Sequence, residues 1–111
     1  MELIETSVFT RQITRLLSEE EYRRFQADLA ANPGMGSLIR GSGGIRKVRV
    51  AVGSRGKSGG ARVIYYRAVR RSLILLLYAF PKNAAANLTA RQTAQLAKVV
   101  QEEFGHETQG S

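Results

Sequence analysis

Alternating apolar and polar positions in the middle of the chain predict three successive β-strands, over residues 45–52, 61–69 and 73–80. In the first of these, the two-residue period of a strand sends Lys47 and Arg49 to one face and the valines to the other. The third is a continuous apolar run, which is typical of a buried central strand. We therefore expect a sheet with one cationic, solvated face and one face packed in the core.

The pairing of the first two predicted strands decides which positively charged side chains lie close together on one face of the sheet. Symmetric pairing about the glycine-rich loop 53–60 gives three opposite pairs: Lys47 with Tyr66, Arg49 with Ile64, and Ala51 with Arg62. Lys47, Arg49, Arg62 and Tyr66 then share one face, and the core face receives Val48, Val50, Val63 and Tyr65. A slip of one residue would exchange the two faces, so this prediction depends on the register.

The first forty residues are predicted to hold a short strand and two helices. Residues 3–9 alternate weakly, as in a strand at a sheet edge, and Thr10 is expected to cap a short helix. Ser18 and Glu21 form a capping box, which opens a second helix that ends before Asn32. The residues expected to face the core from this helix are Tyr22, Phe25 and Leu29.

The remaining segments complete the predicted fold. Residues 33–44 are glycine-rich and are expected to form a loop. Thr89 and Gln92 form a second capping box, opening a helix to about Phe104, with a frayed polar tail from about residue 105. The sequence therefore predicts a single α+β domain over residues 1–111. Its sheet is small, antiparallel with a mixed edge, and has about four strands, with two N-terminal helices and one C-terminal helix.

Charge is distributed unevenly along the chain. The net charge is +8, and no acidic residue lies between Asp28 and Glu102, although that interval holds thirteen of the seventeen Lys and Arg residues. Such a surface favours a polyanion as partner, and nucleic acid is the commonest one. A solvated basic surface that only aids solubility is the alternative. The sequence has no cysteine, no signal peptide and no apolar run near twenty residues, so we expect a cytoplasmic protein without a membrane partner.

The reactive side chains in the sequence exclude most kinds of catalytic site and leave a cationic one. His106 is the only histidine, and the carboxylates are confined to the two ends of the chain, so zinc and two-metal sites are not expected, nor is any cofactor. A cationic site can still cleave RNA, because the 2′-hydroxyl of RNA is its own nucleophile. Arginine matches phosphate oxygens and stabilises the developing charge, and Tyr66 is a candidate to donate a proton or to stack on a base.

Three segments of the sequence resemble the RelE/ParE toxin superfamily, and within it the HigB branch of RelE-like toxins. They are Gly-Gly-Ile-Arg-Lys-Val-Arg at 43–49, Gly-Lys-Ser-Gly-Gly-Ala-Arg-Val-Ile-Tyr-Tyr at 56–66, and Tyr-Ala-Phe-Pro-Lys-Asn at 78–83. The resemblance implies a toxin of a bacterial type II toxin–antitoxin system. Such a toxin cuts mRNA in the ribosomal A site, contacts ribosomal RNA, needs no metal, and is silenced by a helix-turn-helix antitoxin. A toxin–antitoxin heterotetramer is one assembly that the resemblance allows.

The resemblance also implies roles for individual cations. Lys47 would be the general base and Arg62 would brace the scissile phosphate, whereas Arg49 and Lys82 would bind phosphate or stabilise the transition state. The loop cations Arg55 and Lys57, together with Tyr66, are expected to bind the RNA. A two-residue turn at 70–71 would place Lys82 on the face opposite Arg62, unless Pro81 or a β-bulge turns the chain.

The chain departs from the RelE pattern at its C-terminal part. Asn83 follows Lys82 where RelE itself is expected to have an arginine, and no tyrosine follows in the last helix, so Tyr65 or Tyr66 would have to substitute. Two other functions stay open. One is a ParE-like toxin that poisons DNA gyrase, and the other is a nonenzymatic RNA- or ribosome-binding module, for which the same basic patch suffices.

Overall fold

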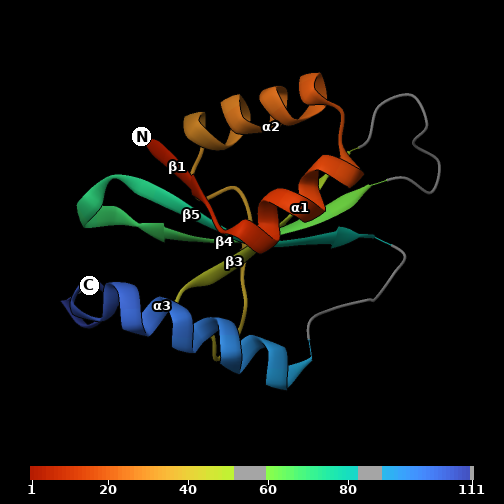
Figure 1. Cartoon of the computed structure of the whole chain (residues 1–111). Helices are drawn as coiled ribbons and strands as arrows, with labels where there is room; N and C mark the ends of the chain where they lie inside the picture. Colours follow the sequence, from red (N-terminus) through yellow and green to blue (C-terminus); the bar gives the residue numbers. More distant parts are fainter. Residues whose placement is uncertain (52–59, 83–88, 111) are drawn as a thin grey trace.

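The computed structural model describes residues 1–51, 60–82 and 89–110, with side chains as far as Glu102. These residues form an α+β fold around a five-stranded sheet of order β1-β5-β4-β3-β2 (Figure 1). The strands are β1 (Glu2–Glu5), β2 (Ser37–Leu38), β3 (Ile45–Val50), β4 (Ala61–Ala68) and β5 (Leu73–Pro81). β1 runs parallel to β5 at one edge, and the other pairs are antiparallel. The predicted fold class is confirmed, and the short β2 within the predicted loop adds a strand.

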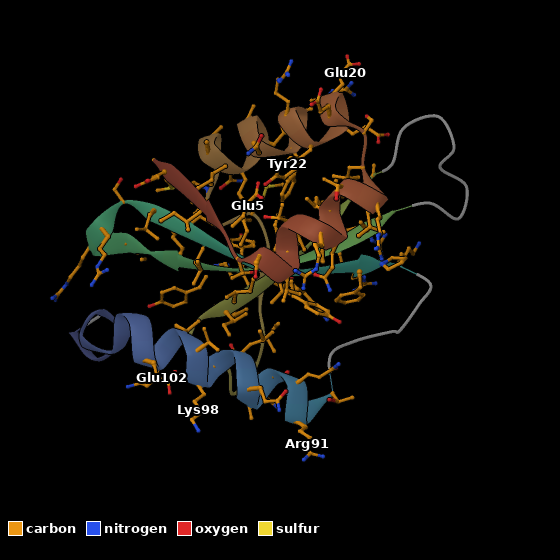
Figure 2. All side chains as sticks on the ribbon, viewed as in Figure 1. Glu5, Glu20, Tyr22, Arg91, Lys98 and Glu102 are labelled. Atoms are coloured by element: carbon orange, nitrogen blue, oxygen red, sulfur yellow. The ribbon has the colours of Figure 1, made fainter. Side chains whose placement is uncertain are left out.

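Helices cover both faces of the sheet. α1 (Ser7–Leu16) and α2 (Glu19–Ala31) lie on one side, and α3 (Ala90–Gly110) lies on the other (Figure 1). Arg91, Lys98 and Glu102 lie on the outer side of α3 (Figure 2). In the described part of the chain, no helix combines the length and the apolar character needed to cross a membrane.

The start of α1 differs from the prediction. The predicted strand over residues 3–9 ends at Glu5, and the helix is capped by Thr6 instead of Thr10. The Thr6 hydroxyl accepts from the Phe9 N–H at 3.1 Å and donates to the Leu77 carbonyl at 3.0 Å. The cap therefore also fixes α1 against β5, a tertiary contact that the local pattern does not contain. Thr10 lies inside the helix, where its hydroxyl donates to Glu5.

Both predicted capping boxes are confirmed. Ser18 and Glu21 exchange side-chain and backbone hydrogen bonds of 2.8 and 3.1 Å at the start of α2. Thr89 and Gln92 exchange bonds of 2.9 and 3.1 Å at the start of α3. Such a box satisfies backbone N–H groups that the first helical turn leaves unpaired. α2 ends before Asn32 as predicted, whereas α3 extends past the predicted end, to Gly110.

Each face of the sheet has its own hydrophobic core. The α1/α2 side buries residues from both helices against the sheet, with Phe9, Ile13, Phe25, Leu29, Val63, Tyr65 and Leu76 among its members. The α3 side buries Val100 against Ile45, Ile64, Tyr66, Leu75, Leu77 and Phe80. The prediction of one fully solvated face is therefore wrong, because α3 covers part of the face that carries the cations. The predicted core face is confirmed, and it is the face toward α1 and α2.

Candidate active site

The observed register of β3 and β4 differs from the predicted one by two residues. Arg49 lies opposite Arg62, Lys47 opposite Ile64 and Ile45 opposite Tyr66. Because two residues are one full side-chain period of a strand, the predicted faces are correct although the predicted partners are wrong. Lys47, Arg49, Arg62 and Tyr66 do share the α3-side face.

Arg49 and Arg62 form the centre of the site. They are directly opposite residues, whose Cβ atoms lie about 4.5–5.5 Å apart in antiparallel sheets, and like charges at such positions repel. Among the described residues, no carboxylate forms an ion pair with either arginine. The Arg62 Nε atom is buried without a hydrogen-bond partner. An anion placed between the two guanidinium groups would remove the repulsion and supply the missing acceptor.

Neither arginine indicates an anion site by itself. Arg67 at the other end of β4 also has a buried, unpartnered Nε, but it lies opposite Ile74 and not opposite a second cation. Arg49 is exposed at the β3 edge, where it also borders a hollow of about 190 Å³ with Glu21 and Asp28 of α2. The grouping of several cations, and not one nitrogen atom, therefore indicates an anion site.

Lys82 joins this group through a β-bulge. Between β4 and β5, Ile64 pairs with Tyr78 and Tyr65 pairs with Leu76, which leaves Leu77 as an extra residue. The extra residue shifts the alternation, so Phe80 lies opposite Arg62 and Lys82 follows two residues later on the same face. The sequence predicted that Pro81 or a β-bulge is needed to bring Lys82 to the face of Arg62, and the structure has the bulge. We call Arg49, Arg62 and Lys82 the cationic cluster.

Gly60 holds the end of the cluster together. Its carbonyl accepts from the Lys82 N–H at 3.0 Å, which extends the β4–β5 ladder past Pro81. A Cβ atom at Gly60 would lie 3.7 Å from Lys82 Cδ, so the lysine side chain packs directly over this position. The φ angle of Gly60 is +138°, which side-chain-bearing residues rarely adopt. A glycine at this position, two residues before Arg62 in the chain, therefore leaves room for the Lys82 side chain.

Lys47 lies beside the cluster. It is a diagonal neighbour of Arg62 across the β3–β4 pair, and such neighbours are about 7–8 Å apart. It is partly buried and lines a groove of about 580 Å³ that also receives Arg40 and the first turns of α3. The structure thus brings together the three residues predicted as catalytic: Lys47, Arg62 and Lys82.

The remaining predicted residues are placed differently. Tyr65 is fully buried on the α1/α2 side, where its hydroxyl donates to the Pro33 carbonyl and accepts from the Gly36 N–H. Tyr66 is on the predicted face but only 6% exposed, in the α3-side core. Neither position favours stacking on a base or donating a proton to RNA. Arg55 and Lys57 lie outside the described residues.

Tyr78 and Phe80 are aromatic residues of this face that the sequence reasoning did not select. Their ring centroids are 5.9 Å apart at an interplanar angle of 47°. Tyr78 is partly exposed and lies in the row of Lys47 and Ile64, next to the row of Arg49 and Arg62. Both residues belong to a continuous apolar run, in which the sequence does not show which side chains face the cations. The bulge at Leu77 decides this, because it turns Tyr78 and Phe80 to the face of Arg62.

The geometry suits the binding of a phosphodiester. Guanidinium groups offer planar pairs of donors to phosphate oxygens, and an ammonium group beside them adds a compact positive charge. Preorganised donors of this kind stabilise charge that develops during reaction. The described residues contain no cluster of three or more His, Cys, Asp or Glu side chains that could hold a metal ion.

A comparison with models of protein families gives one match that spans nearly the whole chain. Residues 7–109 match the family described as the RelE toxin of the RelE/RelB toxin–antitoxin system. The matched span contains α1, the cationic cluster, Lys47 and nearly all of α3.

Proposed function

Because the chain belongs to the RelE toxin family, we propose that it is a ribosome-dependent mRNA endonuclease that stops translation. The family makes the chain a toxin of a toxin–antitoxin system, and its members typically inhibit translation by cutting mRNA. The dependence on the ribosome, the site residues and the neutralising helix-turn-helix antitoxin are parts of the proposal. So are the HigB-type subclass and action in the cytoplasm.

The observation that carries the proposal is the meeting of three strands at one group of cations. Arg49 comes from β3, Arg62 from β4 and Lys82 from the position directly after β5, and no carboxylate among the described residues forms an ion pair with any of them. Repulsion between such groups costs stability, so a bound polyanion is the simplest balancing partner. The grouping of these cations supports the proposal, and the unpartnered Arg62 Nε alone does not, because Arg67 has the same feature without a second cation opposite it.

In the proposed reaction, the 2′-oxygen of one nucleotide attacks the adjacent phosphorus and the bond from phosphorus to the 5′-oxygen breaks. The products are a 2′,3′-cyclic phosphate and a 5′-hydroxyl, so no water molecule is consumed. Lys47, as the neutral amine, takes the proton of the 2′-hydroxyl, and Arg62 and Arg49 hold the non-bridging oxygens. Lys82 stabilises the charge on the leaving 5′-oxygen, which then takes a proton from water. We propose that the ribosome aligns the attacking 2′-oxygen, the phosphorus and the leaving 5′-oxygen. This alignment is needed because the site has no strong base that would speed the reaction of a poorly aligned substrate.

The proposal is tested by adding the purified protein to a defined mRNA with and without ribosomes. We expect cuts within translated codons only when ribosomes are present, with 5′-hydroxyl ends on the downstream fragments. Lys82→Ala should slow the cutting strongly, whereas Arg23→Ala, an exposed arginine on α2 across the sheet, should leave it unchanged. Fragments with 5′-phosphate ends would contradict attack by the 2′-oxygen. Equal cutting of free mRNA would contradict the dependence on ribosomes. No cutting in either reaction, together with DNA damage in cells that express the protein, would favour a gyrase poison.

A further inference from the structure

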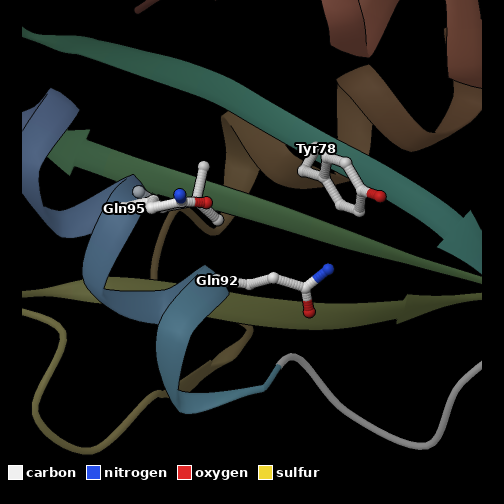
Figure 3. A pocket seen from close by; sticks show the side chains of 4 residues that line it. Tyr78, Gln92 and Gln95 are labelled. Atoms are coloured by element: carbon white, nitrogen blue, oxygen red, sulfur yellow. The ribbon is translucent and has the colours of Figure 1, made fainter.

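A small pocket lies between β5 and the first turns of α3. Its volume is about 140 Å³, and it is lined by Tyr78, Gln92, Gln95 and Leu96 (Figure 3). An aromatic ring, an apolar side chain and two amides thus meet in one place. The proposed reaction does not use any of these residues.

The capping box fixes which end of the Gln92 amide faces this pocket. The oxygen of Gln92 accepts from the Thr89 N–H at 2.9 Å, so the amide nitrogen must point the other way. Figure 3 shows this nitrogen on the side toward Tyr78 and the oxygen turned away. Gln92 therefore presents two N–H donors in a fixed orientation. The side chain of Gln95 is exposed and forms no hydrogen bond within the described structure, so its amide can serve as donor or acceptor.

The pocket adjoins the cationic cluster. Tyr78 lies opposite Ile64, and Phe80, two residues further along, lies opposite Arg62. Tyr78 is thus a diagonal neighbour of Arg62 across β4 and β5, and such neighbours are about 7–8 Å apart. This separation matches the reach from a phosphate to the base of the same nucleotide. A strand whose phosphate sits at Arg62 can place one adjoining base beside Tyr78.

We propose that this pocket binds a single pyrimidine base of the RNA, next to the scissile phosphate, and so selects where the toxin cuts. This inference rests on the proposed function. Tyr78 offers a ring on which a base can stack, and the Gln92 donors meet a carbonyl oxygen of the base. A cavity of about 150 Å³ accommodates one benzene molecule, so the volume suits one six-membered ring and is small for a purine.

The test measures cleavage of a pool of ribosome-bound mRNAs in which the nucleotides flanking the cut are varied. For the wild-type protein we expect a preference for pyrimidines over purines at one flanking position. A preference of about 5- to 150-fold corresponds to one well-placed set of base contacts. Gln92→Glu keeps an oxygen to cap α3 and replaces the donors by an acceptor, so this preference should fall about tenfold or disappear.

Two further variants separate the ring from the amides. Tyr78→Leu removes the stacking surface and should weaken the preference, while Gln95→Ala should change the choice between uracil and cytosine. Gln101→Ala is the matched control, because Gln101 is an exposed glutamine further along α3. Circular dichroism should show the same helix content in all four variants.

The outcomes separate this inference from the proposed function. Cutting by the wild type with no base preference at any flanking position overturns the inference and leaves the proposed function intact. A preference that survives both Gln92→Glu and Tyr78→Leu also overturns it. A wild-type protein that cuts no ribosome-bound mRNA overturns the proposed function together with the inference that rests on it.

Discussion

Tyr65 and Arg62 lie three residues apart on β4, and their side chains turn to opposite faces of the sheet. On the α1/α2 side, the buried Tyr65 hydroxyl has both a donor and an acceptor, and Arg46 donates to the Gly36 carbonyl at 2.7 Å. On the α3 side, Arg62 faces Arg49, and its Nε has no partner. Arg67, on the same face as Tyr65, also has an unpartnered Nε, but it lies opposite Ile74 and not opposite a second cation. The difference between the two faces is therefore the paired hydroxyl on one side and the two facing cations on the other.

This difference separates residues that hold the fold from residues that act on a ligand. Pairing polar groups with the protein stabilises the folded state, whereas leaving cations unpaired costs stability and keeps them available. We therefore expect substitutions on the α1/α2 side to lower stability first. Substitutions in the cationic cluster should lower activity first.

The largest loss of stability is expected from Phe9→Ala. Phe9 is completely buried between α1 and the sheet, so its truncation should lower the free energy of unfolding by about 3–5 kcal/mol. Urea denaturation measures this value. Val8→Ala is the control, because Val8 lies on the same helix and is 41% exposed, and its effect should stay within about 0.5 kcal/mol. Similar losses for the two variants would show that the α1/α2 core is not the main source of stability.

A smaller loss is expected from Tyr65→Phe. This change leaves the Gly36 N–H and the Pro33 carbonyl without their partner, which should cost about 1–3 kcal/mol. The same change at Tyr78, on the other face, removes a hydroxyl that has no hydrogen bond within the described structure and should cost close to nothing. Thermal unfolding compares the two variants. Equal melting temperatures for them would contradict the division between the faces.

The smallest effect concerns alkaline pH. Burial, assisted by the hydrogen bond to Glu5, raises the pKa of Tyr22 above its ordinary value (Figure 2). A raised pKa in the folded state gives stability that is complete below about pH 10, the value for an unfolded tyrosine, and is lost as the pH rises further. Wild-type stability should therefore fall more steeply above pH 10 than that of Tyr22→Phe. Parallel curves of unfolding free energy against pH would refute this.

Local signals in the sequence predicted much of the fold. Ser18 and Thr89 cap helices through bonds to residues three positions on, so both helix starts were correct. The alternation in β3 placed Lys47 and Arg49 on the correct face even though the register was wrong by two residues. Thr6 was a signal that could have located α1, because it is a capping residue three positions before Phe9.

What the sequence could not supply depends on contacts between distant segments. The bulge that carries Phe80 and Lys82 to the face of Arg62 lies in the run of residues 73–80, where every side chain is apolar and none marks an extra residue. The need for glycine at position 36 could not be predicted either, because it comes from a contact between two segments. A Cβ at Gly36 would lie 2.5 Å from the Lys47 carbonyl oxygen of the neighbouring strand β3. The site predictions themselves stay predictions until variants are measured.

The most direct test of the account measures the cleavage rate and the unfolding free energy of Arg62→Ala side by side. We expect cleavage of ribosome-bound mRNA to fall by about 10²- to 10³-fold, as when a donor to a developing charge is removed. The free energy of unfolding should stay the same or rise, because the repulsion with Arg49 and the unpartnered Nε both disappear. Cleavage within threefold of the wild-type rate, or a loss explained by unfolding, would contradict the account.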